Sequence, residues 1–183
     1  MWLSRRNRGT DREADEIECR NREFVESLDL PAVDSVLDLV PFMEERFGRS
    51  IRLMPFASDP ADPDSLDSSA PCGLWLATAD TDYVFYDTAI SRAHAEIIVG
   101  HEFGHMLKRH RGNAQAPMDS GSLGGLITDI DPATVQLVLG RTGYNEPEEF
   151  EAEMLGSLLQ EHVNASRPSD FREADPIART LLR

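Results

Sequence analysis

The feature that most constrains this chain is the string His101-Glu102-Phe103-Gly104-His105, which lies in an apolar segment with helical spacing. Residues i and i+4 of a helix lie on one face about one turn apart, so both imidazoles can reach a single metal ion. Glu102 projects beside them and can accept a proton from an attacking water. The pattern therefore predicts a zinc hydrolase site with His101 and His105 as ligands and Glu102 as the catalytic base.

A catalytic zinc site needs a third protein ligand and one open position. Spacing excludes two arrangements, because Lys108 and Arg111 replace the Gly and His of metzincins, and Gly124 replaces the glutamate of the aminopeptidase pattern H-E-x-x-H-x18-E. The remaining candidates open the last predicted helix: Glu148, Glu149 and Glu151. We expect Glu149 to be the ligand, with Glu148 and Glu151 as alternatives. Glu149 and Glu153 resemble a pair found in helical gluzincins, where an acid or amide four residues after the ligand glutamate hydrogen-bonds a ligand histidine. The resemblance implies that Glu153 does so here and fixes the tautomer of that histidine.

Other polar residues receive lesser roles. Tyr144 and His162 are candidates for a hydrogen-bond donor to the oxyanion of a peptide substrate. His110, five residues after His105, is expected to cap the helix C-terminus and not to bind metal. His94 is expected to be a surface or packing residue. The sequence offers no Ser or Cys nucleophile with a recognisable base nearby.

The order of the elements predicts an α+β fold. Charged and weakly apolar residues favour a helix over about 11–30, and a second helix over 31–47 with a break at Pro41 and an end at Gly48. Further elements are predicted at these ranges: strands over 51–56, 73–78 and 83–87, the last two as a hairpin; the motif helix, capped by Thr88 or Ser91, to about 110; a short helix over 133–139; and a last helix over 147–163.

Composition divides the chain into three regions. Residues 1–48 form an N-terminal helical region, and residues 49–165 form the metal-binding domain. That domain includes the Asp- and Pro-rich loop 57–71 and an irregular segment, 112–145, which resembles an insertion. Residues 166–183 form a tail that two prolines interrupt.

Charge and cysteine content restrict the setting. Lys and Arg total 18 and Asp and Glu total 33, for a formal charge of −15, which argues against direct binding to nucleic acid or to an anionic membrane. No signal peptide and no apolar stretch long enough to span a membrane is visible. Cys19 and Cys72 are expected to be free thiols in a reducing compartment, so we expect a cytoplasmic protein.

Two motifs resemble those of the ImmA/IrrE family of zinc metallopeptidases. The first runs from Ile97 to His110, and the second is Glu149-x-x-Ala152-Glu153 followed by Leu155-Gly156. Glu153 stands where that family usually has Asn. The resemblance implies a zincin-like fold, in which a small antiparallel sheet packs on the active-site helix, and a Zn²⁺ cofactor.

The resemblance also implies a partner, since members of that family commonly act beside a helix-turn-helix repressor and relieve repression, in some cases by cleaving it. We therefore expect a zinc endopeptidase that acts on a cytoplasmic transcriptional regulator. The alternative is a non-proteolytic, metal-containing module that docks to a helix-turn-helix transcription factor, for which the negative charge would suit a basic partner. A third hypothesis is an interaction protein in which the motif is accidental.

Overall fold

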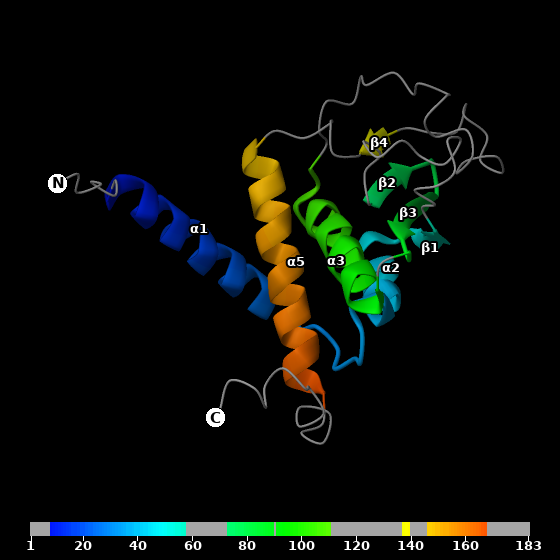
Figure 1. The fold of residues 1–183 in the computed structure, drawn as a ribbon, viewed down its shortest axis with the longest axis horizontal. Helices are drawn as coiled ribbons and strands as arrows, with labels where there is room; N and C mark the ends of the chain where they lie inside the picture. Colours follow the sequence, from blue (N-terminus) through cyan, green and yellow to red (C-terminus); the bar gives the residue numbers. More distant parts are fainter. Residues whose placement is uncertain (1–7, 58–72, 90, 111–136, 140–145, 168–183) are drawn as a thin grey trace.

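The computed structural model describes residues 8–57, 73–89, 91–110, 137–139 and 146–167 (Figure 1). The fold of this part is α+β, as predicted from the sequence. The elements in chain order are α1 (Arg8–Glu26), the 3₁₀ helix η1 (Val36–Leu39), α2 (Val40–Phe47), β1 (Ser50–Phe56), β2 (Gly73–Ala77), β3 (Thr81–Asp87), α3 (Arg92–Lys108), β4 (Leu137–Leu139) and α5 (Glu146–Ser166).

The motif helix α3 occupies the centre of the molecule. The sheet and α2 lie on one side of it, α5 lies along the other, and α1 packs across α5 with its N-terminal end directed away from the body (Figure 1). Because α3 is covered on both sides, its buried residues run almost continuously from Ala95 to Leu107 and do not form a single stripe. A helix that is buried all round is typical of the core of a layered fold.

The sheet has the strand order β1-β3-β2-β4. The predicted hairpin is confirmed, since β2 pairs antiparallel with β3 and Ala77 lies opposite Asp82. The expectation of a purely antiparallel sheet is wrong, because β1 pairs parallel with β3. β3 lies between β1 and β2, which run in opposite directions. It therefore pairs antiparallel with β2 and parallel with β1.

A helix is predicted over 133–139, but the last three residues of this range, which are the ones that the structure describes, are not helical. Leu137–Leu139 form β4, which pairs antiparallel with β2 and places Leu139 opposite Trp75. A short apolar run fits a strand or a helix equally well by periodicity, and here the open edge of β2 supplies the hydrogen-bond partners. The segment 112–145 therefore contributes a strand to the sheet. The loop 57–71 lies outside the described residues.

The N-terminal helices differ from prediction mainly at their ends. α1 stops at Glu26, and Asp29 has a left-handed φ of 53° in the connection that follows. The predicted second helix divides into η1, capped by the Ser35 hydroxyl, and α2, which has Pro41 in its first turn. The end at Gly48 is confirmed, because this residue closes α2 with φ of 64°, a conformation that glycine adopts without strain.

One hydrophobic cluster joins the N-terminal helices to the rest of the fold. Leu39 and Met43 pack in the same buried cluster as Val84, Val99 and Phe103. The predicted helical region 1–48 thus shares its core with the region 49–165. No helix of the described residues is both long and apolar enough to cross a membrane.

The backbones of α3 and α5 approach each other very closely. A β-carbon on Gly104 would lie 2.7 Å from the Ala152 carbonyl oxygen, and one on Gly156 would lie 2.9 Å from the His101 amide nitrogen. Since real β-carbons do not approach backbone atoms this closely, Gly104 and Gly156 are required for the observed packing. The sequence anticipated this for Gly104, because glycine inside a helix costs about 1 kcal/mol relative to alanine and needs a compensating reason.

Replacing Gly104 by alanine should push α5 away from α3. We expect Gly104→Ala to lower the free energy of unfolding by about 1–3 kcal/mol, as overpacking of a core does. Gly100→Ala is the matched control, because a β-carbon there would meet its nearest neighbour, Gly156 Cα, at 3.4 Å, an ordinary contact. Gly100→Ala should leave the free energy of unfolding unchanged or raise it by up to about 1 kcal/mol. Urea unfolding of both variants measures the difference, and equal stabilities would contradict the close packing.

Candidate metal centre

The two histidines of the motif lie on one face of α3, as the i, i+4 spacing predicts. Ser91 begins this helix by accepting a hydrogen bond from the His94 amide, which confirms one of the two predicted caps. The Nε2 atoms of His101 and His105 are 3.0 Å apart. The His105 side chain is fully buried, whereas 24% of the His101 side chain is exposed, so the pair can be reached from solvent on the His101 side.

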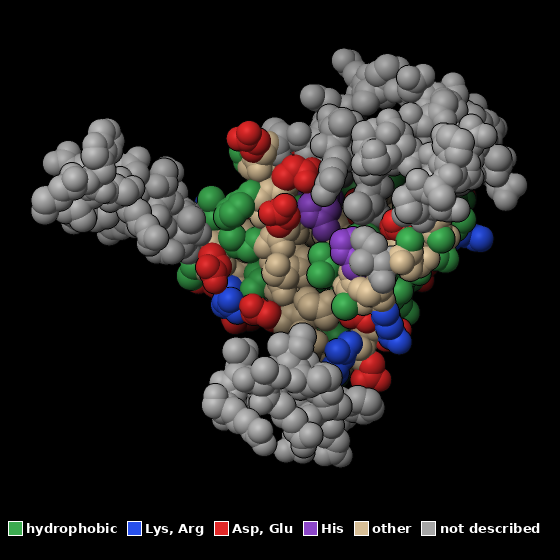
Figure 2. Space-filling model, viewed as in Figure 1, with side chains coloured by type: hydrophobic (Ala, Val, Ile, Leu, Met, Phe, Trp, Pro, Cys, Tyr) green, Lys and Arg blue, Asp and Glu red, His purple; other side chains and the backbone are tan. Residues whose placement is uncertain are grey.

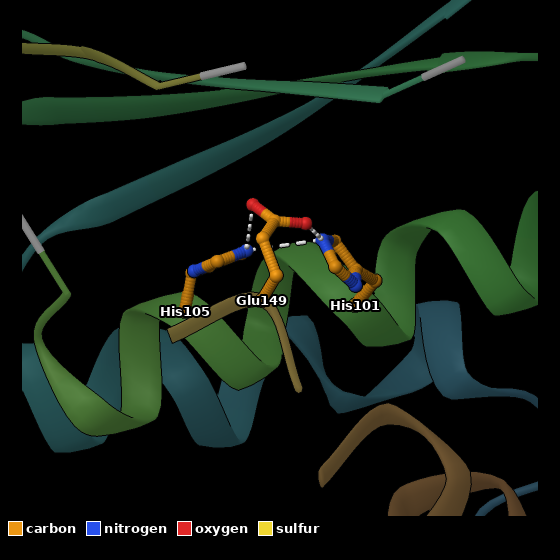
Figure 3. A group of neighbouring side chains, drawn as sticks. All are labelled: His101, His105 and Glu149. Atoms are coloured by element: carbon orange, nitrogen blue, oxygen red, sulfur yellow. Dashed lines mark hydrogen bonds and ion pairs between the residues drawn. The ribbon is translucent and has the colours of Figure 1, made fainter. Parts of the chain in front are cut away.

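Glu149 completes the group from the first turn of α5. Its Oε2 lies 3.5 Å from His101 Nε2, and its Oε1 lies 3.6 Å from His105 Nε2 (Figure 3). His101, His105 and Glu149 are the one group of His, Cys, Asp or Glu within the described residues whose ligand atoms converge as a metal site requires. Figure 2 shows histidine side chains between α3 and α5, next to acidic side chains near the start of α5.

The spacing of these donors fits a small divalent cation. Zinc bonds to nitrogen and oxygen of about 2.0–2.1 Å, at tetrahedral angles, separate the ligand atoms by about 3.3 Å. The three observed separations of 3.0, 3.5 and 3.6 Å bracket this value. Two imidazole nitrogens and one carboxylate are also the donor set of the zinc sites in many hydrolases.

The Glu102 carboxyl is buried next to this group. Its Oε2 has no hydrogen-bond partner among the described residues, which is unusual for a buried carboxyl oxygen and typical of functional sites. Burial, and secondarily the charge of Glu149, raises the pKa of Glu102 well above its usual value. A β-carbon at Gly73 would lie 2.8 Å from Glu102 Oε1, so the start of β2 passes directly over this carboxyl.

The other ring nitrogen of His105 faces a residue that the sequence analysis did not assign to the site. His105 Nδ1 lies 3.0 Å from His110 Nδ1, and His110 Nε2 lies 3.1 Å from Glu151 Oε2. Burial, followed by the nearby His101 and His110, lowers the pKa of His105 to about 2. His105 is therefore neutral at any ordinary pH, which is the form that binds metals.

His110 was missed because its position depends on how α3 ends. The helix closes at Lys108, and Arg109 takes a left-handed conformation with φ of 56°. This turn lets the His110 amide bond to the His105 carbonyl oxygen at 3.0 Å, so His110 does contribute to the helix end as expected. The same turn folds the His110 ring back against His105, a contact that helical spacing alone does not predict.

Of the other acidic residues at the start of α5, Glu148 lies outside the metal-binding group. Glu151 points to His110 and Lys108 and so is not positioned as a ligand. Partial burial opposes its ionisation, but hydrogen bonds from Lys108 and His110 outweigh this effect and hold the pKa of Glu151 below its usual value. The prediction that Glu153 hydrogen-bonds a ligand histidine is wrong. It is exposed and lines a hollow between α5 and α1 with Arg22.

The lesser candidates lie away from the metal-binding group or outside the described residues. His162 Nε2 is 3.0 Å from the Pro31 carbonyl oxygen, and its position thirteen residues after Glu149 places it ~20 Å further along α5. It therefore cannot stabilise an oxyanion at this site. Tyr144 and Cys72 lie outside the described residues. His94 is partly buried, consistent with a packing residue, and Cys19 is an exposed free thiol.

Comparison of the chain with family models, with curated proteins and with solved structures found no match.

The raised pKa of Glu102 predicts how the stability of the metal-free protein depends on pH. A group with a raised pKa holds its proton more strongly in the folded state, so its contribution to stability is complete below pH ~4.5 and is lost as pH rises towards the folded pKa. Glu102→Gln cannot ionise and should avoid this loss. In EDTA, its stability relative to the wild type should increase with pH by up to about 1.4 kcal/mol per unit above pH ~4.5.

Urea unfolding at several pH values between 4.5 and 8 measures this difference. Glu153→Gln is the control, because Glu153 is an exposed carboxylate on α5 whose replacement should give a nearly flat difference. A flat profile for Glu102→Gln would contradict the burial of an ionisable carboxyl at this position.

Proposed function

We propose that this protein is a zinc-dependent endopeptidase. The observation that carries the proposal is the convergence of three donors, His101 Nε2, His105 Nε2 and the Glu149 carboxylate, beside the buried carboxyl of Glu102. This is the donor set of a hydrolytic zinc centre together with the base that such a centre requires.

The number of donors favours a catalytic over a structural zinc. Structural zinc sites are closed by four protein ligands, whereas catalytic sites keep one position for water or substrate. Among the described residues, three ligands converge here, and the side chains of His101 and Glu149 are 24% and 27% exposed. A substrate can therefore approach on this side.

Each residue has a distinct role in the proposed reaction. A zinc ion held by His101, His105 and Glu149 would polarise the scissile carbonyl and make a water molecule more acidic. Glu102 accepts the proton of the attacking water and then transfers it to the leaving amine.

The substrate class is proposed from the resemblance of the two motifs to the ImmA/IrrE family. We propose that the substrate is a helix-turn-helix repressor in the cytoplasm. The formal charge of −15 supports a basic protein partner and disfavours direct contact with nucleic acid. The same charge also favours the alternative function, a metal-containing module that docks to a helix-turn-helix factor without cleaving it.

Metal binding is the first test. The purified protein should contain one zinc per chain, and zinc should raise its melting temperature, because a ligand that binds only the folded state stabilises it. Glu149→Ala should weaken zinc binding strongly, whereas Glu153→Ala should not, since Glu153 faces away from the site. Metal analysis and competition with a chelator measure both effects. A wild-type protein without stoichiometric zinc, and without stabilisation by added zinc, would exclude the proposed function.

Cleavage is the second test and separates the two functions. Genes adjacent to its own should first be searched for a helix-turn-helix repressor, which is then co-expressed with the protein and followed by immunoblot. Glu102→Gln should retain zinc, because Glu102 is not a ligand, but should lower cleavage by at least about 100-fold, the usual contribution of a general base. If Glu102→Gln relieves repression as well as the wild type does, the docking function is favoured over proteolysis.

A further inference from the structure

A chain of hydrogen bonds leads from His105 away from the metal-binding face to the N-terminal helix. His105 Nδ1 contacts His110 Nδ1 at 3.0 Å, and His110 Nε2 contacts Glu151 Oε2 at 3.1 Å. Lys108 Nζ then donates to Glu151 Oε1 and to Asn21 Oδ1, both at 2.7 Å. We call His110, Glu151, Lys108 and Asn21 the support chain.

The donors and acceptors of the support chain are consistent with one proton arrangement. If His105 Nε2 binds a metal through its lone pair, its Nδ1 carries the hydrogen and donates it to His110 Nδ1. His110 then carries its own hydrogen on Nε2 and donates it to Glu151 Oε2. Glu151, as a carboxylate, accepts this hydrogen bond and the one from Lys108, so every polar atom of the chain has the partner that it requires.

Two residues of α5 act on the two ring nitrogens of His105, one directly and one through His110. Glu149 faces Nε2 directly, whereas Glu151 faces Nδ1 through His110. His105 is fully buried and His110 is 7% exposed, so neither ring has solvent into which it could turn. The orientation of His105 is thus set by two residues of the same helix.

Lys108 connects this arrangement to α1. Its ammonium group contacts Asn21 of α1 and Glu151 of α5, and lies 4.6 Å from the centre of the Phe24 ring. Asn21 is 1% exposed, so this contact is buried on the α1 side. Lys108 is also the only lysine among the 18 basic residues of the chain. A compact ammonium donates in three directions that do not share a plane, whereas the donors of the arginine guanidinium are coplanar.

We propose that His110 and Glu151 are positioning residues that hold His105 with Nε2 towards the metal, and that Lys108 and Asn21 make α1 part of this support. The proposal rests on the proposed function, because it takes His105 as a zinc ligand. It differs from the sequence-based expectation for Glu153, since the supporting carboxylate is Glu151 and acts through a second histidine.

The first test measures zinc affinity, by competition with a chelator, in purified full-length variants. His110→Ala and Glu151→Gln should each bind zinc about 10- to 100-fold more weakly than the wild type, as is usual when a partner of a ligand histidine is lost. His110→Gln should recover part of the affinity, because its amide can accept from His105 and donate to Glu151. Glu153→Gln, a matched exposed glutamate on the same helix, should bind as the wild type does.

The second test uses Co²⁺ in place of zinc, because its visible spectrum reports the ligand geometry. His110→Ala and Glu151→Gln should change the position and intensity of the absorption bands, a change that mere loss of stability would not produce. Lys108→Arg and Asn21→Ala should cause smaller losses of zinc affinity in the same direction. If Lys108→Arg and Asn21→Ala both bind zinc with wild-type affinity, α1 does not contribute to the support of His105.

Failure of this proposal differs from failure of the proposed function. If the wild type binds no zinc, the metal centre and its support are both excluded. If the wild type binds zinc and His110→Ala and Glu151→Gln match Glu153→Gln in affinity and in cobalt spectrum, the positioning role alone is overturned. Should His110→Ala fail to fold, Glu151→Gln and His110→Gln decide, since both nearly preserve the shape of the side chain.

Discussion

The contact on which the rest of the structure depends is the close approach of α3 and α5. Gly104 lies against Ala152, and Gly156 lies against the backbone at Gly100 and His101, with no room for a β-carbon on Gly104 or Gly156. Small residues four apart on each helix allow the two backbones to touch along about one turn. This contact brings the first turn of α5 over the histidines of α3, and without it a carboxylate on α5 would be too distant to join them.

The same contact explains why two neighbouring glutamates of α5 have different tasks. Residues two apart on a helix point in different directions. With the axis held close to α3, Glu149 reaches the Nε2 atoms of both histidines, and Glu151 reaches past the end of α3 to His110 and Lys108. Glu153, a further two residues along, faces α1 and solvent. A rotation of α5 would turn Glu149 away from the histidines, so the glycine contact determines which glutamate faces them.

Sequence reasoning succeeded where the chemistry is local to one helix. The i, i+4 histidines, the glycine that needs a close neighbour, and the cap at Ser91 follow from spacing and propensity within α3. It failed where the outcome depends on other elements. The parallel pairing of β1 and the strand Leu137–Leu139 depend on which edge of the sheet is open, and His110 depends on a left-handed turn at Arg109. The four-residue spacing that favoured Glu153 carries no information about the direction of the helix axis.

The electrostatics of the site favour a cation. The Glu102 carboxyl is buried and its pKa is raised by burial and by Glu149, so a negative charge there is unfavourable in the metal-free protein. The Nε2 atoms of His101 and His105 lie 3.0 Å apart, and burial lowers the pKa of His105, so this imidazole stays neutral. A divalent cation between these groups would favour the ionised form of Glu102 and would accept the Nε2 lone pairs of both histidines. The packing that holds His101, His105 and Glu149 together would also contribute to affinity, because donors already held in place lose little entropy when they bind.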